Sequence, residues 1–201
     1  MKKTLLCLCL FSSAAYANQC EIIDSELAAS YSEMETYGNY NEKNEEKYQS
    51  SEKRFKDALA KIEKLEGKFC TWEKGPEVGV GMLTSKDQKL QILVWDWQSG
   101  GTMHEYGSIW RYQLPNGTWK TEVNELSSFI TRLVPLKLNG KPYYYIETSD
   151  IYSQCHHAIA AKFYQITEKG LEEANLIQGK KPTSNIEVSF ISYTNNDLPK
   201  S

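Results

Sequence analysis

The most unusual local feature of the sequence is a short glycine-containing segment that follows two tryptophans. It reads Gln98-Ser-Gly-Gly-Thr-Met-His-Glu105. Adjacent glycines allow a tight path with exposed backbone N–H groups, which can bind an anion or a carbonyl oxygen. Flanking aromatic residues, Tyr106 among them, would form the walls of such a site, and an acidic or imidazole group would orient the ligand. The candidate ligand-binding residues are Trp95, Asp96, Trp97, Gly100, Gly101, Thr102 and His104.

A structural interpretation of the same segment competes with the binding hypothesis. In a hairpin connection the glycines supply positive φ angles and the tryptophans pack in the core. The glycine spacing does not match a dinucleotide- or phosphate-binding loop, which also leads into a helix. Both interpretations place the segment between two strands.

A second segment that could carry chemistry runs from Asp150 to His157 and contains Cys155 beside two histidines. A Cys/His hydrolase needs a thiolate and an imidazole that face each other. Neighbouring residues on a strand point to opposite faces, so Cys155 and His156 cannot form that pair in extended structure. Pairing of Cys155 with His157 or with His104 remains geometrically open. We nevertheless expect no catalytic group here.

A zinc site is a further hypothesis for the same histidines. The ligands would be drawn from His104, His156, His157 and a carboxylate such as Glu105 or Asp150. Zinc accepts imidazole and carboxylate ligands, but the two adjacent histidines again alternate faces, and the sequence contains no His-Glu-x-x-His helix. We therefore expect no bound metal and no cofactor.

Three consecutive tyrosines, Tyr143 to Tyr145, suggest an aromatic surface for sugars or peptides. Strand alternation puts only Tyr143 and Tyr145 on one face, with Tyr144 on the other. Core packing is the better explanation of this run.

The first 17 residues have the three parts of a secretory signal peptide. Lys2 and Lys3 are followed by an apolar run from Leu5 to Phe11 and by the small-x-small site Ala15-Tyr16-Ala17. The apolar run is shorter than the roughly 20 residues that span a bilayer. We expect cleavage after Ala17 and a periplasmic or secreted bacterial protein without membrane insertion after cleavage.

Net charge and cysteine count limit the classes of partner and the possible disulfides. The formal net charge of the 201 residues is −3, and this mild acidity argues against nucleic acid as a partner. Cleavage would leave three of the five cysteines: Cys20, Cys70 and Cys155. In an oxidising compartment two of them would pair. A Cys20–Cys70 disulfide is favoured, with Cys70–Cys155 as the next alternative.

Two apolar stripes with helical spacing predict a helical hairpin before Cys70. The first consists of Ile23, Leu27, Tyr31, Met34 and Tyr37, and the second of Phe55, Leu59, Ile62 and Leu65. A break signal at Gly38–Asn41 separates them. Residues 21–46 are strongly acidic and residues 47–68 basic, which suits antiparallel packing. A continuous helix would hold Cys20 and Cys70 about 75 Å apart, whereas a hairpin brings them together.

After Cys70 the apolar spacing changes to the two-residue alternation of strands. The expected strands are 90–97, 109–114, 119–123, 130–138, 143–148, 158–166, 172–177 and 186–193. Asn116-Gly117 and Asn139-Gly140 predict tight hairpins. Both faces of residues 90–97 are apolar, which predicts a central strand covered on each side. No helix-length crossover separates the strands, so we expect antiparallel pairing.

The stretch from Ser85 to Met103 resembles one in uncharacterised exported bacterial proteins. The shared features are a helical start, a Ser-x-Asp turn, a strand that ends in Trp-Asp and a Gly-Gly-Thr loop, here Ser85-Lys-Asp87, Trp95-Asp96 and Gly100-Gly-Thr102. The resemblance covers Pro76 to Ile166. It implies a β-rich exported domain and no particular activity.

The sequence thus predicts an α+β protein with a signal peptide (1–17), an N-terminal helical hairpin (18–70), an antiparallel β-meander (71–194) and a flexible tail (195–201). The meander would form a sandwich, a barrel or a partial propeller. Our leading hypothesis is a non-catalytic periplasmic or secreted binding module for an envelope protein, of which an inhibitor or immunity-type protein is a specific version. The alternative is a metal- or thiol-dependent envelope hydrolase that uses residues 98–105 and 150–157. The hydrolase requires the Cα atoms of His104 and His157 to approach within reach of one metal ion or one substrate, and it is excluded if they lie at opposite ends of the sheet.

Overall fold

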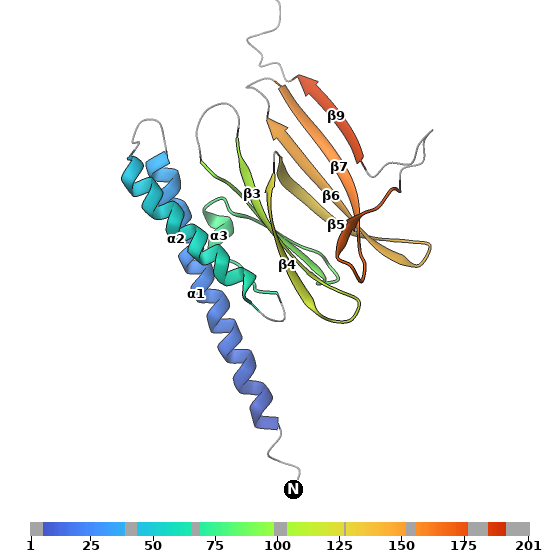
Figure 1. Ribbon diagram of the computed structural model, residues 1–201, viewed down its shortest axis with the longest axis horizontal. Coiled ribbons are helices and arrows are strands. Elements are labelled where there is room, and N and C mark those ends of the chain that lie inside the picture. Colours follow the sequence, from blue (N-terminus) through green and yellow to red (C-terminus); the bar gives the residue numbers. More distant parts are fainter. Residues whose placement is uncertain are drawn as a thin grey trace, which may run out of the picture. The chain divides into compact units, whose positions relative to one another are not determined.

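The chain forms two compact units, Met1–Val80 and Gly81–Ser201, drawn in Figure 1. The computed structural model describes residues 6–38, 44–65, 69–98, 104–126, 128–151, 156–176 and 185–191; in residues 6–17, 125–126, 150–151, 156–157 and 185–191 only the backbone is described. Residues 71–80, which the sequence pattern places in the β domain, fall in the first unit. The predicted tail, 195–201, and Cys155 lie outside the described residues.

The first unit is the predicted helical hairpin. Its helices are α1 (Leu6–Gly38), α2 (Glu45–Glu63) and the short α3 (Lys74–Glu77). α1 ends at the predicted break, and α2 begins after Asn44, whose side chain accepts a hydrogen bond from the Lys47 N–H, as an N-cap does. Four of the five residues of the first predicted stripe are buried, and all four of the second. These two stripes form the core of the hairpin.

Two ion pairs show that α1 and α2 are antiparallel. Glu33 pairs with Arg54, and Glu26 pairs with Lys61. Between the two pairs the residue number falls by seven along α1 and rises by seven along α2, as antiparallel helices require. The Arg54 guanidinium holds the pKa of Glu33 below its usual value. Both pairs are well exposed and contribute little free energy, so their effect is on the register of the hairpin. The predicted charge complementarity is therefore confirmed as contacts.

The segment after α2 is attached to α1 at two points. The Cys20–Cys70 disulfide is confirmed, with the two Cα atoms 5.4 Å apart. Asp24, which is buried, accepts hydrogen bonds from three backbone N–H groups: those of Glu73 and Lys74 on Oδ2, at 2.8 and 2.9 Å, and that of Gly75 on Oδ1, at 2.9 Å. The carboxylate thus satisfies N–H groups at the start of α3. Sequence analysis missed this contact.

The second unit consists of two antiparallel sheets. The first has the order β1-β2-β3-β4: Gly81–Thr84, Leu90–Asp96, Tyr106–Gln113 and Trp119–Leu126. The second has the order β5-β6-β7-β8: Phe129–Leu138, Lys141–Ile151, His156–Ile166 and Leu171–Glu173. β9 (Asn185–Ile191) also pairs with β7, beside His156–Lys162, whereas β8 pairs with Tyr164–Ile166. The described strands form two open sheets and no closed barrel, which confirms the α+β prediction.

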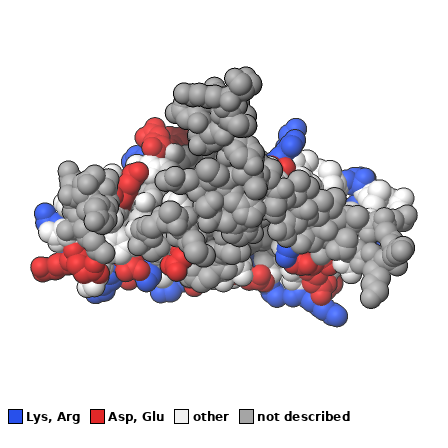
Figure 2. Space-filling view, turned by 90° about the horizontal axis from the view of Figure 1, so that it is seen from above, with Lys and Arg blue, Asp and Glu red and all other residues white. Residues whose placement is uncertain are grey.

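Charged side chains of both signs are interspersed on the surface drawn in Figure 2. Lysine and arginine side chains lie beside aspartate and glutamate side chains in small groups. This mixing fits the small net charge of the chain, −3.

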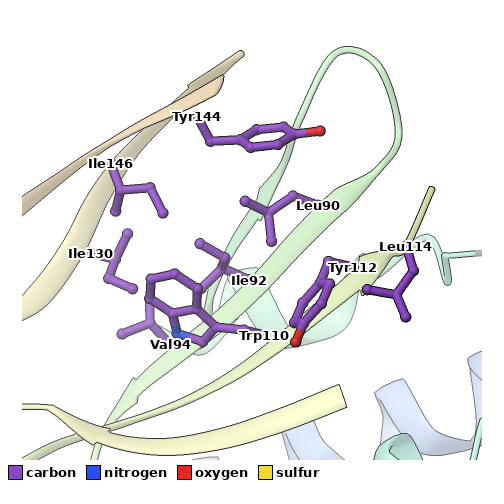
Figure 3. Close-up of a cluster of buried hydrophobic side chains, with 9 residues drawn as sticks. All are labelled: Leu90, Ile92, Val94, Trp110, Tyr112, Leu114, Ile130, Tyr144 and Ile146. Carbon is purple, nitrogen blue, oxygen red and sulfur yellow. The ribbon is translucent and has the colours of Figure 1, made fainter. Parts of the chain in front are cut away.

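The two sheets share one hydrophobic core, shown in Figure 3. Its buried residues are Leu90, Ile92, Val94, Trp110, Tyr112, Leu114, Ile130, Tyr144 and Ile146. The Tyr144 hydroxyl donates a hydrogen bond to Asp87 Oδ2 at 2.9 Å, from the second sheet to the turn between β1 and β2. Burial, followed by this hydrogen bond, raises the pKa of Tyr144. This hydrogen bond joins the two sheets in addition to the apolar core.

We expect Asp24→Ala to lower the free energy of unfolding by about 2–4 kcal/mol, because hydrogen bonds to a charged group are strong and three backbone N–H groups would lose their acceptor. Urea denaturation of the oxidised protein, followed by far-UV circular dichroism, measures the change. Glu35→Ala, which removes an exposed carboxylate from the same helix, is the control. Equal midpoints for the two variants would refute the role of Asp24.

We also expect the free energy of unfolding to fall as the pH rises from about 10 to about 12. Burial is the main cause that raises the pKa of both Tyr112 and Tyr164 from the ordinary value of 10.0 to about 12. In that interval the unfolded chain loses these protons while the folded chain keeps them, so unfolding is favoured. Denaturation at a series of pH values measures the fall. The Tyr112→Phe/Tyr164→Phe double variant should flatten it, and an unchanged slope would contradict the assignment.

Candidate functional site

The predicted glycine segment connects β2 to β3 as a hairpin. Asp96 and Tyr106 are register partners at the end of the two strands, and the Trp97 N–H donates to the Glu105 carbonyl at 2.9 Å. Gly100, Gly101 and Thr102 lie outside the described residues. The hairpin that sequence analysis gave as the structural interpretation is therefore present.

Trp95 belongs to the core of this hairpin. Its side chain is fully buried, and its ring meets the Trp97 ring edge-on with centroids 5.3 Å apart. A Cβ atom at Gly107 would lie 2.4 Å from the Trp95 indole, so the close packing requires glycine there. Of the two candidate tryptophans, only Trp97 is partly exposed. Tyr106, considered as another wall, is also buried.

The chemically distinctive group at this hairpin is the pair formed by Asp96 and His104. His104 Nδ1 lies 2.5 Å from Asp96 Oδ2, and the Gln98 N–H donates to Asp96 Oδ1 at 2.8 Å. The His104 ring also stacks on Tyr106, with an interplanar angle of 11°. The carboxylate and the aromatic ring together fix the orientation of the imidazole.

This orientation determines what His104 can do. When Nδ1 donates its proton to the carboxylate, Nε2 carries the lone pair and can accept a proton or bind a metal ion. The His104 side chain is 40% exposed and that of Asp96 is 17% exposed. The structure thus brings together two of the seven predicted site residues as an oriented, accessible base.

The second predicted segment connects β6 to β7. Ile151 and His157 are register partners, as are Asp150 and Ala158. Cys155 lies outside the described residues, and the side chains of the two histidines are not described. The chemistry proposed for Cys155 with a histidine stays a prediction.

The two connections lie at the same end of the second unit. The rings of Trp110 on β3 and Tyr164 on β7 are 5.3 Å apart, and the two strands run in the same general direction (Figure 1). His104 precedes Trp110 by six residues, and His157 precedes Tyr164 by seven. The two histidines thus do not lie at opposite ends, and their approach to within reach of one metal ion or one substrate stays a prediction.

A different surface of the second sheet is apolar and only partly covered. We use "outer face" for the side of β5, β6 and β7 that alternates with the core residues Tyr144 and Ile146. Register pairs assign to it Val134, Leu136, Tyr143, Tyr145, Ile159 and Phe163. Leu136 and Ile159 are 38% and 40% exposed, and the rings of Tyr145 and Phe163 are 5.6 Å apart. Core packing therefore explains Tyr144 but not the two flanking tyrosines.

Glu147 is a carboxylate on the outer face. Its carboxylate accepts hydrogen bonds from the Tyr145 hydroxyl at 2.9 Å and from Thr131 Oγ1 at 3.3 Å, and Arg132 is its register partner on β5. Burial, followed by the bond to Glu147, raises the pKa of Tyr145. Sequence analysis did not identify this face, although the alternation of residues 132–136 was visible.

Over the part of the chain whose side chains are described, no group of three or more His, Cys, Asp or Glu residues is placed to hold a metal ion. Among the described helices, none is long and apolar enough to cross a membrane. No protein-family model, curated protein or solved structure matches the chain.

We expect neutral His104 to carry its proton on Nδ1, because Asp96 accepts from that nitrogen. Two-dimensional 15N–13C NMR of the imidazole distinguishes the tautomers. In Asp96→Ala the proton should move to Nε2, which is the tautomer that free histidine prefers. Glu105→Ala should leave the wild-type pattern unchanged. A wild-type His104 that is protonated on Nε2 would refute the geometry.

Proposed function

We propose that the chain is an exported, non-catalytic binding protein that recognises another envelope protein through its outer face. The observation that carries this proposal is the exposure of Leu136 and Ile159 on the same face as the Tyr145–Phe163 ring pair. Burial of such apolar area on contact with a protein contributes roughly 25 cal/mol per Å².

The chemistry of the outer face fits a protein partner. Protein interfaces are enriched in aromatic residues and arginine around an apolar centre, with a polar rim. Here Tyr145 and Phe163 occupy the centre, and Arg132 and Lys141 are exposed at its margin. Glu147 already accepts hydrogen bonds from two hydroxyl groups. If a partner buried it, both carboxylate oxygens would keep a hydrogen-bond donor, which lowers the cost of burial.

Export to the periplasm or the medium is supported by the signal-peptide pattern of residues 1–17 and by the Cys20–Cys70 disulfide. Disulfides persist mainly in oxidising compartments. Cleavage after Ala17 would shorten α1 to the part from Asn18 to Gly38. An inhibitor or immunity-type protein, which blocks an envelope enzyme by covering it, is the specific form of this proposal.

We expect a photo-crosslinking residue at position 136 or 159 to label one and the same envelope protein in living cells. The same residue at position 123 should not label it, because Val123 lies on the other sheet; it is a fair control because it is also an exposed aliphatic residue, at 48%. Mass spectrometry of the crosslinked bands identifies the labelled protein.

The affinity of the purified pair provides the second measurement. Leu136→Asp should weaken binding at least roughly tenfold, because it places a charge in the apolar contact, while Val123→Asp should leave it unchanged. Circular dichroism shows whether each variant is folded. Equal labelling from all three positions, or equal loss of affinity in both variants, would contradict an outer-face interface.

A further inference from the structure

The exposed apolar side chains of the chain are concentrated on the outer face. Among the residues whose side chains are described, five large apolar ones are clearly exposed, and three of these belong to the outer face: Leu136, Leu138 and Ile159. Leu138 is the most exposed of the three, at 48%, and it shares the face of Leu136 because it lies two residues later on β5. A contiguous apolar surface of this kind is typical of a contact with another protein.

The edge of β5 does not favour the addition of another strand. Among the described strands, β5 forms one edge of the second sheet. Leu138 and Lys141 close the tight Asn139-Gly140 turn as a hydrogen-bonded pair, so alternate residues from Leu138 backwards direct their backbone groups to β6. Pro135 alternates with them and faces the edge, where it has no N–H to donate. We therefore expect a partner to contact the face of this sheet and not its edge.

Four register pairs of β5 and β6 form the centre of the outer face. In order along the strands they are Arg132–Glu147, Val134–Tyr145, Leu136–Tyr143 and Leu138–Lys141. The two middle pairs are apolar and aromatic, and both end pairs carry charge. One end has a carboxylate beside a guanidinium group, and the other has an ammonium group beside an exposed leucine. This order is self-complementary, because reversing it places the ammonium group of one copy over the carboxylate of another.

We propose that the outer faces of two copies of this chain pack on each other in a two-fold symmetric dimer. The axis lies between the two faces, perpendicular to β6, and passes between the positions of Tyr143 and Tyr145. It places Lys141 of each copy opposite Glu147 of the other, so that one contact occurs twice, as a two-fold interface requires. The inference goes beyond the proposed binding of an envelope protein: the second copy covers the outer face while that protein is absent.

The groups at the two ends can make these contacts. Glu147 accepts one hydroxyl hydrogen bond on each oxygen, at 2.9 and 3.3 Å. A carboxylate has about four acceptor sites, so Glu147 can also accept the Lys141 ammonium group of the second copy. The same axis places Arg132 opposite Leu138 of the second copy, and the apolar stem of an arginine can cover a leucine while its charged head stays in water.

The size of the contact indicates a weak dimer. Lys141 and Glu147 are separated by six residue steps along β6, about 20 Å at roughly 3.4 Å per step. Three strands at a spacing of about 4.8 Å extend about 14 Å across the face. Such an area is smaller than the about 800 Å² that each partner contributes to a standard interface. Weak self-association leaves the outer face accessible to a partner that binds more tightly.

Sedimentation equilibrium of the purified, oxidised chain tests the proposal at concentrations from about 1 µM to about 1 mM, the range of weak complexes. We expect a monomer–dimer equilibrium. Leu136→Asp should weaken the dimer at least roughly tenfold, because it places a charge in the apolar contact. Val123→Asp, the matched control on the other sheet, should leave the dimer unchanged. A denaturing gel without reductant excludes a dimer joined by a disulfide.

Charge reversal tests the two-fold arrangement. Lys141→Glu and Glu147→Lys should each weaken the dimer by roughly three- to tenfold, because like charges would face each other twice. An equimolar mixture of the two variants should recover the dimer, since both contacts of the mixed pair again join opposite charges. Far-UV circular dichroism identifies any variant that is unfolded.

The results that would overturn the dimer differ from those that would overturn the proposed function. A wild-type chain that is monomeric throughout, a dimer of equal strength in Leu136→Asp, or no recovery in the mixture of folded variants would refute the dimer. A monomeric chain that still labels an envelope protein from positions 136 and 159 would refute the dimer alone. Labelling of the second copy and of no other protein would support the dimer and refute the envelope partner.

Discussion

The pairing of β2 with β3 is the constraint on which the second unit depends. Six consecutive residues of β2, Leu90 to Trp95, are buried, so both faces of the strand are covered, as the sequence predicted. A slip of one residue would exchange the two faces and bury the wrong set of side chains. The same register places Asp96 opposite Tyr106 and brings His104 back to Asp96. Correct core packing and the orientation of the imidazole are therefore one structural requirement.

The turn before β2 shows how a sequence motif can be explained by structure alone. Ser85 Oγ donates to Asp87 and accepts from the Leu90 N–H, and Asp87 accepts from the Tyr144 hydroxyl. Gln88, which follows Asp87 in this turn, has a positive φ of 55°. The Ser-x-Asp part of the resemblance thus has a structural role here: it closes the turn and connects the two sheets. This structural role explains the Ser-x-Asp motif without a bound ligand. Membership in the group of exported proteins that the sequence resembles stays a prediction.

Local sequence patterns predicted the helical hairpin, the disulfide and most strands. They failed for a contact between residues far apart in the sequence and for the type of one turn. Asn139 and Gly140 both have positive φ, as a tight Asn-Gly turn requires, whereas at Asn116-Gly117 only the glycine does. Pro115 precedes that pair, and the Gly117 N–H bonds back to the Leu114 carbonyl in a longer turn. The Asp24 contact joins residues about fifty positions apart, which no periodicity reveals.

The candidate site illustrates the same limit. Sequence alone selected Asp96 and His104 by type, but it could not show that the carboxylate engages Nδ1, because that depends on the hairpin register. It treated Trp95 as a wall, although the ring is buried. The hairpin register, and not residue type alone, therefore determines which nitrogen of His104 is engaged.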